Sequence, residues 1–184
     1  SSEEAQQRLW HALQLHMSFA EFERFLHSRI DVYLGDITEA RCGLEPAAHR
    51  RLVSAMSSAI HIAASLNRRS ARVCMNVNLR GPFMLLQELW PHISPGSSIV
   101  FIGSISGSVG GPITPQYATS KAGLLALTKY LARIGAELRV RVNCVAPGWI
   151  DSPMMAGRPP LMPVPLGRLG NAEEVAALVR FDTE

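Results

Sequence analysis

Residues 104–121, SISGSVGGPITPQYATSK, place three reactive groups around a glycine-rich loop and the start of a helix. The groups are the hydroxyl of Ser104, the phenol of Tyr117 and the ammonium of Lys121. Because Tyr117 and Lys121 are four residues apart, their side chains would lie one turn apart on the same helix face. A phenol and an ammonium that share a face can act on one bound group. The stretch therefore predicts proton-transfer chemistry.

The sequence on both sides of this stretch predicts alternating strands and helices. Apolar or alternating runs rich in β-forming residues predict strands at 29–34, 59–64, 98–103 and 139–145. Apolar stripes with helical spacing predict helices at 3–27, 49–57, 72–90, 117–136 and 171–181. This alternation is typical of an α/β fold in which helices cover both faces of a parallel sheet.

Two segments depart from this regular pattern. Gly81 and Pro82 interrupt the helix at 72–90, where proline removes a backbone hydrogen bond and favours a kink. Residues 153–166 are rich in Met, Pro and Gly, which suits a mobile segment over a site better than a helix or strand. We call residues 153–166 the flap.

Size and composition predict one globular domain in the cytoplasm. The chain has 184 residues with 47% hydrophobic and 18% charged residues, and its net charge of +3 comes from scattered arginines, which argues against nucleic-acid binding. Cys42, Cys74 and Cys144 are odd in number and far apart, which indicates reduced thiols and neither a disulfide nor a metal site. No apolar run approaches a membrane span, and the polar start SSEEAQQR is unlike a signal peptide.

From about Asn76 to Phe181 the chain resembles the short-chain dehydrogenases/reductases. Ser104, Tyr117 and Lys121 fall on that family's Ser and Tyr-x-x-x-Lys set with the expected spacing, and Asn78 in NVNLRGPF falls on its helix-interrupting Asn. The resemblance implies a three-layer, Rossmann-like parallel sheet. It also implies an enzyme that transfers hydride between NAD or NADP and a carbonyl or alcohol.

The segment RVNCVAPGWIDSPM is similar to the family's Pro-Gly segment, which lies along the nicotinamide. The resemblance assigns Pro147, Gly148, Ile150 and Ser152 to cofactor binding, along with Tyr117 and Lys121. Ser152 stands where Thr is more usual, and its hydroxyl can make the same contact with the carboxamide. The later run PLGRLGNAEEVAALV resembles the family's sequence after the substrate-covering segment.

The first third of the chain resembles the extended branch of the same superfamily, including reductase domains that act on acyl thioesters. The resemblance rests on RIDVYLGDIT and HIAAS. It implies that Asp36 and Ile37 flank the adenine. It also implies that Ala63, Ala64 and Ser65 line the path of the dinucleotide. The choice between NAD and NADP stays open.

The family's first strand, glycine-rich turn and pyrophosphate-binding helix have no counterpart before Asp36, because the first glycine is Gly35. We therefore expect a sheet that lacks its first two strands and its last strand. Three interpretations are open: a piece of a longer enzyme, a gene product without its cofactor half, or a new pairing of these strands. The start at Ser1 without Met favours the first.

By this resemblance, Tyr117 exchanges the proton with the substrate oxygen, and Ser104 anchors that oxygen. Lys121 would lower the pKa of the Tyr117 phenol and bind the nicotinamide ribose. Asn78 would hold a water that extends the proton path.

Three functions remain open at this point. A ketone or alcohol dehydrogenase is favoured over an acyl-thioester reductase, and a non-catalytic binding or dimerisation module is the third alternative. The apolar flap favours a hydrophobic substrate. The family also implies a homodimer or homotetramer formed through the helices at 72–90 and 117–136.

Overall fold

The computed structural model describes Ala20, Arg24, Tyr33, Asp36 and a set of longer segments: residues 39–55, 58–61, 70–112, 114–152, 155, 157 and 159–183. The strand expected at 29–34 and most of the helix expected at 3–27 lie outside the described residues. The same holds for four expected cofactor-binding residues, Ile37, Ala63, Ala64 and Ser65. The expectations for all of these stay predictions.

Three parallel strands form the sheet, in the order β1-β2-β3. They are β1 (Ser58–His61), β2 (Ser98–Ile102) and β3 (Arg141–Val145). β2 pairs with both neighbours, so that Val100 lies opposite Ile60 on one side and Asn143 on the other. The strands expected at 98–103 and 139–145 and the parallel arrangement are thus confirmed. The strand expected at 59–64 is confirmed as far as His61, since residues 62–64 lie outside the described residues. β3 begins two residues later than expected, because Arg139 adopts a left-handed φ of 56° in the preceding turn.

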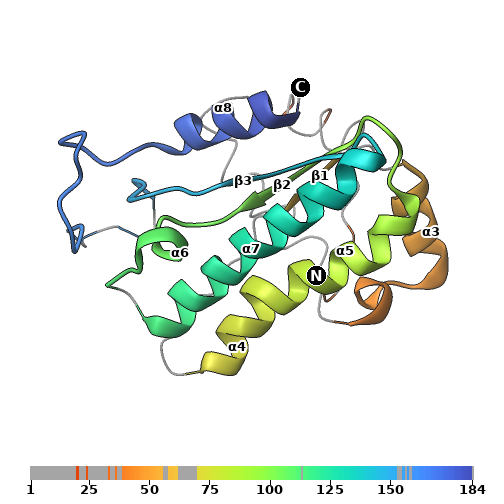
Figure 1. Cartoon of the computed structure of the whole chain (residues 1–184), viewed down its shortest axis with the longest axis horizontal. Coiled ribbons are helices and arrows are strands. Elements are labelled where there is room, and N and C mark those ends of the chain that lie inside the picture. The colour runs from red at the N-terminus through yellow and green to blue at the C-terminus, as the bar shows by residue number, and fades with distance from the viewer. Residues whose placement is uncertain are drawn as a thin grey trace.

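Helices cover both faces of this sheet, as the alternating pattern predicted (Figure 1). The long helix α7 (Pro115–Glu137) packs on one face, and α8 (Ala172–Thr183) contacts β2 and β3 on the other. Val100 and Phe101 are adjacent in β2 and therefore point to opposite faces, yet both are buried. A strand that buries both of its faces is typical of the centre of a three-layer α/β fold.

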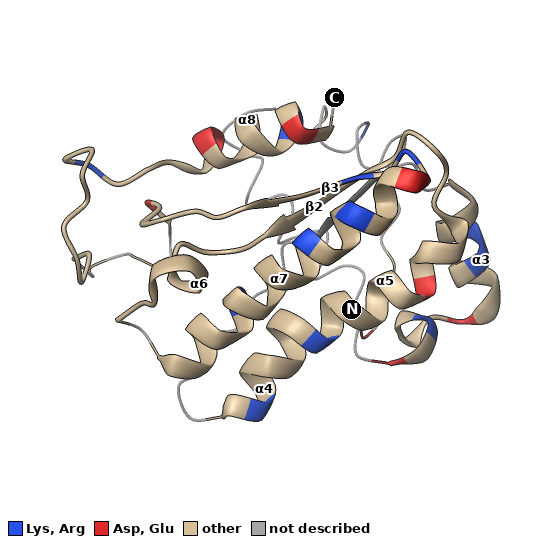
Figure 2. Ribbon diagram, viewed as in Figure 1, with Lys and Arg blue, Asp and Glu red and all other residues tan. Residues whose placement is uncertain are grey.

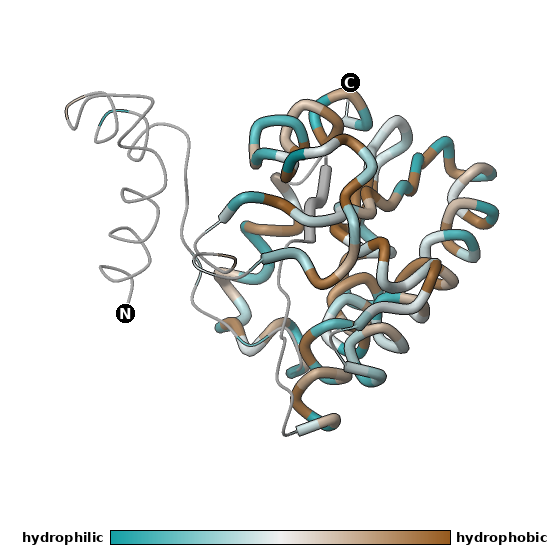
Figure 3. The backbone as a smooth tube through the Cα atoms, turned by 90° about the vertical axis from the view of Figure 1, so that its left-hand side faces the viewer, coloured by the Kyte–Doolittle hydropathy of each residue, from teal (hydrophilic) through white to brown (hydrophobic). Residues whose placement is uncertain are grey.

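A hydrophobic core between the sheet and α7 holds the first layer in place. Its buried members are Leu86, Ile99, Phe101, Leu124, Leu131, Val140 and Val142. Bands of hydrophilic and hydrophobic residues alternate along the helices in Figure 3, as expected for helices with one buried face. Burial of apolar surface at about 25 cal/mol per Å² is the main stabilising contribution for such a layer.

The helix expected at 72–90 consists of four consecutive pieces. They are α4 (Ala71–Met75), a π-helical turn η2 (Asn76–Arg80), α5 (Gly81–Leu89) and a 3-10 turn η3 (Trp90–His92). The interruption predicted at Gly81 and Pro82 lies in the five residues before them. The N–H of Gly81 donates to the carbonyl of Asn76, five residues back. Since Pro82 has no N–H and its ring crowds the preceding turn, the helix widens there and restarts with Pro82 in its first turn.

Before β1 lie a short 3-10 turn, η1 (Ala40–Gly43), and the helix α3 (Pro46–Ala55). The helix expected at 49–57 thus begins three residues earlier, at a proline, whose fixed φ suits the first helical position.

The described residues of the flap form neither helix nor strand, as expected. The two ends of this segment are joined, because Ile150 and Gly170 form a parallel bridge. Asp151 N–H donates to the Gly170 carbonyl at 2.7 Å, and Gly170 N–H donates to the Trp149 carbonyl at 2.9 Å. The flap is therefore a loop whose flanking residues, Ile150 and Gly170, are held side by side.

Candidate active site

Ser104 lies two residues after the carboxyl end of β2, which is at Ile102. Gly103 N–H donates to the Val145 carbonyl at 2.7 Å, which extends the contact between β2 and β3 by one residue. A Cβ at position 103 would lie 2.6 Å from the Cys144 sulfur, so any larger residue there would force that side chain to move. The Ser104 hydroxyl then accepts a hydrogen bond from Ser106 N–H at 3.2 Å. These contacts fix Ser104 at the edge of the sheet.

A short helix, α6 (Ser106–Val109), brings this edge against α7. Gly107 makes the close approach possible, since a Cβ on it would lie 2.7 Å from the backbone carbonyl carbon of Lys121. Helix α7 begins after Thr114, whose hydroxyl accepts from Tyr117 N–H at 3.4 Å. Pro115 occupies its first turn. The helix start predicted near Tyr117 is confirmed and lies two residues earlier, at Pro115, whereas the predicted glycine-rich loop contains the short helix α6.

Tyr117 and Lys121 share one face of α7, as predicted. The Lys121 Nζ lies 5.9 Å from the centroid of the Tyr117 ring. Lys121 is only 2% exposed, and its Nζ donates to the Ile102 carbonyl at 2.8 Å. The ammonium therefore lies behind the phenol and ties α7 to the end of β2.

Burial decides the direction of the Tyr117 pKa shift. Burial raises the pKa of Tyr117 above its usual value, and negative charge on Cys74 adds to the rise. A hydrogen bond with Ser104 acts in the opposite direction on this pKa. Burial lowers the pKa of Lys121, while negative charge on Cys144 and Cys74 would raise it. The net direction of the Tyr117 pKa shift is upward, opposite to the expected lowering, because desolvation outweighs the contact with Ser104. The separate effect of Lys121 on this pKa stays a prediction.

Asn78 is fully buried in the π-helical turn and lies against α7. Its side-chain amide donates to the Ser120 hydroxyl at 3.0 Å and to the Cys74 sulfur at 3.2 Å. Ser120 in turn donates to the Tyr117 carbonyl at 2.7 Å. The helix interruption is thus connected to the backbone of the tyrosine. Sequence reasoning missed Ser120 and Cys74, since a serine and a cysteine inside helices carry no spacing signal.

A cavity of about 850 Å³ lies in front of Ser104 and Tyr117. Gly148, Ile150 and Ser152 also line it, so the structure brings five of the predicted site residues to one space. The described flap residues that line it are Met155, Gly157, Pro159, Leu161, Met162, Pro163, Val164 and Pro165. Residues far apart in the sequence therefore form one pocket.

Four described residues of the predicted site do not line this cavity. The side chains of Lys121 and Asn78 are buried in the protein and bond to Ile102 and Ser120. Pro147 contributes a backbone contact. The Pro147 carbonyl accepts from Ile105 N–H at 3.0 Å, which ties the Pro-Gly segment to the loop after Ser104. Asp36 lies near η1 instead, where its carbonyl accepts from Glu39 N–H at 3.0 Å. Its expected role beside an adenine stays a prediction.

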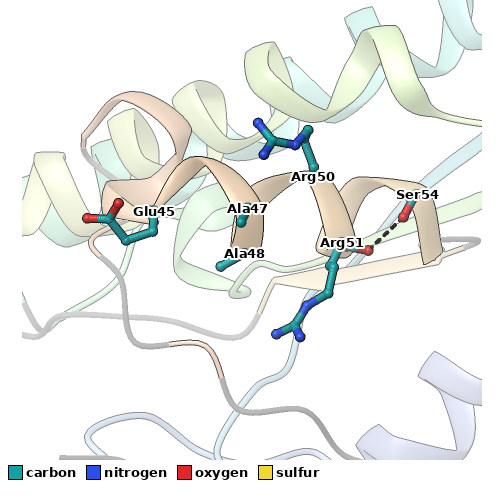
Figure 4. Close-up of a pocket in the computed structure, with 6 residues that line it drawn as sticks. All are labelled: Glu45, Ala47, Ala48, Arg50, Arg51 and Ser54. Atoms are coloured by element: carbon teal, nitrogen blue, oxygen red, sulfur yellow. Dashed lines mark hydrogen bonds between the residues drawn. The ribbon is translucent and has the colours of Figure 1, made fainter.

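A second depression lies on α3 (Figure 4). It is lined by Glu45, Ala47, Ala48, Arg50, Arg51 and Ser54. Arg50 and Arg51 point in different directions, and the Ser54 hydroxyl donates to the backbone carbonyl of Arg51 at 3.0 Å. This surface lacks a phenol or a hydroxyl paired with a reactive group, so the cavity in front of Tyr117 is the candidate active site.

None of the three cysteines forms a disulfide. Within the segments that the structure describes, no cluster of three His, Cys, Asp or Glu side chains could hold a metal ion. Over the same residues, no helix combines the length and the apolar character that crossing a bilayer requires.

Comparison with known proteins decides the family. Residues 52–181 match a family model described as enoyl-(acyl carrier protein) reductase. The chain belongs to the short-chain dehydrogenase/reductase family. One relative in this family, the 3-oxoacyl-[acyl-carrier-protein] reductase FabG of Thermotoga maritima, is 41% identical over 58% of this chain and 47% of its own length. The acetoacetyl-CoA reductase of Shinella zoogloeoides is 36% identical over 58% of this chain and 48% of its own length.

Among solved structures, a 3-oxoacyl-[acyl-carrier protein] reductase from Brucella melitensis superposes with a TM-score of 0.74 at 25% identity. The match covers 90% of this chain and 69% of that structure. These short-chain dehydrogenase/reductase structures have Rossmann folds, which agrees with the parallel three-layer arrangement. The chain spans about half the length of the curated relatives it matches.

Proposed function

We propose that this chain carries the proton-transfer site of an NAD(P)-dependent oxidoreductase that interconverts a carbonyl and an alcohol. The observation that carries the proposal is that Ser104 and Tyr117 line one cavity together, with the Lys121 ammonium 5.9 Å from the centroid of the Tyr117 ring. An alkoxide formed in an apolar site is costly unless a proton reaches it. Tyr117 is positioned to supply that proton.

Each residue has a separate role in this proposal. The Ser104 hydroxyl holds the substrate oxygen beside the Tyr117 hydroxyl, which gives or takes the proton. Burial raises the pKa of Tyr117, so the phenol keeps its proton until negative charge develops on the substrate oxygen. Asn78 and Ser120 hold the backbone of α7 and therefore the direction of the phenol. The buried ammonium of Lys121 favours the phenolate when it forms.

The nicotinamide end of NAD or NADP fits the residues present. Gly148 has open space where a side chain would begin, so a flat ring can approach the backbone there. The Ser152 hydroxyl faces the same cavity and can bond a carboxamide. When bound, the nicotinamide supplies or accepts the hydride. The pyrophosphate and adenine contacts, including Asp36 and residues 63–65, stay predictions, as does a sheet without its first two and last strands.

The names of the relatives favour a ketone reductase over the acyl-thioester reductase alternative. Two of them are reductases of a 3-oxoacyl or acetoacetyl group, which carries a ketone. The described flap residues that line the cavity are mostly apolar, which supports a hydrophobic substrate. The intact Ser104, Tyr117 and Lys121 set also argues against a non-catalytic module.

We also propose a homodimer or homotetramer that forms through α4, α5 and α7. Phe83 on α5 is 52% exposed and Tyr130 on α7 is 55% exposed, and Val73 on α4 is also exposed. Large apolar side chains on the outer face of a helical layer are typical of an interface. A reduced cytoplasmic environment remains the expected location, consistent with cysteines that form no disulfide.

The test is Tyr117→Phe, which removes the hydroxyl and keeps the ring. We expect ketone reduction to fall by at least about 10²-fold. Affinity for reduced nicotinamide cofactors, measured by fluorescence titration, should stay within a few-fold. Tyr130→Phe, on the exposed face of the same helix, is the matched control and should keep full turnover. Unchanged turnover in Tyr117→Phe would sink the assignment, and no cofactor binding up to millimolar would favour the non-catalytic module.

A further inference from the structure

We propose that the Ser106 hydroxyl is a second substrate-binding group, which donates to an acceptor oxygen close to the reacting carbonyl. The inference rests on the proposed function, because it concerns the substrate of the same site. It goes further by assigning a specificity-determining residue outside the set of Ser104, Tyr117 and Lys121. The consequence is a preference for ketones that carry a second carbonyl group near the ketone.

Ser106 lies in the wall of the cavity, at the first position of α6. It lines the cavity and is only 7% exposed. The helix α6 consists of four uncharged residues and packs against α7 (Figure 2). Ser106 N–H donates to the Ser104 hydroxyl at 3.2 Å. Since the amide nitrogen and the hydroxyl oxygen of one serine are only a few atoms apart, the hydroxyls of Ser104 and Ser106 lie close together.

The Ser106 hydroxyl has no hydrogen-bond partner among the residues that the structure describes. It is nevertheless not sealed inside the protein. Among the described side chains, His49 Nε2 is the only fully buried nitrogen or oxygen atom without a hydrogen bond. A ligand that displaces water from the cavity therefore leaves the Ser106 hydroxyl unpaired, at a cost in free energy, unless the ligand itself supplies an acceptor.

Gly111 leaves the space that this hydroxyl occupies. A Cβ on Gly111 would overlap the Ser106 hydroxyl oxygen and would lie 2.8 Å from the Ser106 Cβ. A larger residue at 111 would thus push the serine side chain aside. Gly111 also lines the cavity. The hydroxyl therefore has a defined place in the cavity wall, next to Ser104.

Two neighbouring hydroxyls favour a substrate with two neighbouring acceptor oxygens. Ser104 and Tyr117 would hold the oxygen of the reacting ketone, and Ser106 would donate to the second oxygen. In a 3-oxo ester or thioester a single methylene separates the two carbonyl groups, so both oxygens can reach this wall together. A simple ketone leaves the Ser106 hydroxyl without an acceptor, which weakens its binding relative to the 3-oxo compound.

The experiment compares ethyl 3-oxobutanoate with heptan-2-one, which are methyl ketones with chains of the same length. Of these, the ester alone carries a second carbonyl. Ser106→Ala removes the hydroxyl and keeps the N–H that bonds Ser104. We expect the ratio of kcat/KM for the ester to kcat/KM for the ketone to fall by about 3- to 10-fold in this variant. The intrinsic reactivities of the two ketones differ, but this difference is the same in both proteins and cancels in the comparison.

Ser108→Ala is the matched control, because it removes a hydroxyl from the same helix at an exposed position that does not line the cavity. Its ratio should stay within about 2-fold of the wild type. A purely structural role of Ser106 would lower the thermal stability and would reduce kcat/KM equally for both ketones, and this result overturns the inference. An unchanged ratio with weaker cofactor binding also overturns it, because the hydroxyl would then serve the cofactor.

A binding measurement tests the inference even if neither ketone is reduced, a result that counts against the proposed function alone. Trp149 lines the cavity, so its fluorescence should report ligands that enter. The dissociation constant of the ester, relative to that of heptan-2-one, should rise by about 3- to 10-fold in Ser106→Ala. Loss of the signal in Trp149→Phe identifies its source. An unchanged relative affinity, or no binding of either compound, overturns the inference.

Discussion

The Lys121 ammonium lies 5.9 Å from the centroid of the Tyr117 ring and donates its hydrogen bond to the Ile102 carbonyl. Lys121 thus links α7 to the end of β2 and also places a positive charge near the Tyr117 ring. The Tyr117 hydroxyl interacts with Ser104, and burial determines the direction of its pKa shift. The hydrogen bond to Ile102 therefore holds Lys121 in place, whereas burial sets the direction of the Tyr117 pKa shift.

The raised pKa of Tyr117 predicts the pH dependence of catalysis. Carbonyl reduction needs the protonated phenol, so its rate should stay level through neutral pH and fall only at alkaline pH. Alcohol oxidation needs the phenolate and should rise with pH. Ser104→Ala removes the contact that lowers the pKa of Tyr117. The rate of reduction should fall, and the alkaline limb of its pH profile should move to higher pH. Ser108→Ala, at an exposed position of α6, is the control, and a limb that moves to lower pH would refute the assignment.

Lys121→Met should separate stability from activity. Burial lowers the pKa of Lys121 in the folded protein, so the protonated side chain opposes folding at neutral pH. Wild-type stability should consequently rise as pH increases from the lowered folded pKa toward the unfolded value. Lys121→Met has no titratable group at this position, so its stability should lack this dependence on pH. At pH 7 we expect Lys121→Met to be about 1 kcal/mol more stable in denaturant unfolding, with turnover reduced by about 10²-fold.

The control for this variant is Lys129→Met, which changes an exposed lysine on the same helix. Its stability and turnover should match the wild type. A large loss of stability in Lys121→Met would show that the hydrogen bond to Ile102 matters more than the desolvated charge.

Gly107→Ala should disrupt the contact between α6 and α7. The added Cβ would lie 2.7 Å from the Lys121 carbonyl carbon and 2.8 Å from the Ala122 nitrogen, and backbone atoms cannot easily move away. We expect a loss of about 1–3 kcal/mol in unfolding free energy together with reduced turnover, because Ser104 moves relative to Tyr117. Gly148→Ala should cost less than about 0.5 kcal/mol, since its Cβ would meet nothing within 4 Å. Equal losses in the two variants would argue against this contact.

Glu174→Gln should loosen the end of the flap. Hydrogen bonds from Arg168 and from Asn171 N–H hold the pKa of Glu174 at about 2, below its usual value of 4.5. The stabilisation is therefore present above pH 4.5 and is lost as the pH falls toward 2. At neutral pH, limited chymotrypsin digestion should cut the flap faster in Glu174→Gln than in the wild type. Glu137→Gln, which removes the same charge from an exposed position at the end of α7, should be cut at the wild-type rate.

The sequence alone determined those features that depend on local periodicity. Tyr117 and Lys121 share a face because an α-helix repeats every 3.6 residues, whatever surrounds it. The three described strands could be located because buried parallel strands require continuous apolar runs. The interruption of the helix at 71–92 was also predicted, although its position moved to the five residues before Gly81. Such features follow from a few neighbouring residues.

Only the tertiary structure decided the electrostatics and the shape of the site. The pKa of Tyr117 depends on burial by the loop after β2, and the contacts of Asn78 with Ser120 and Cys74 join two helices. The cavity combines lining residues from 104–112 with described residues of 155–165, and no single segment of the sequence reveals that these meet. Desolvation is a sum over all surrounding atoms, so it is fixed only when the chain has brought those atoms together.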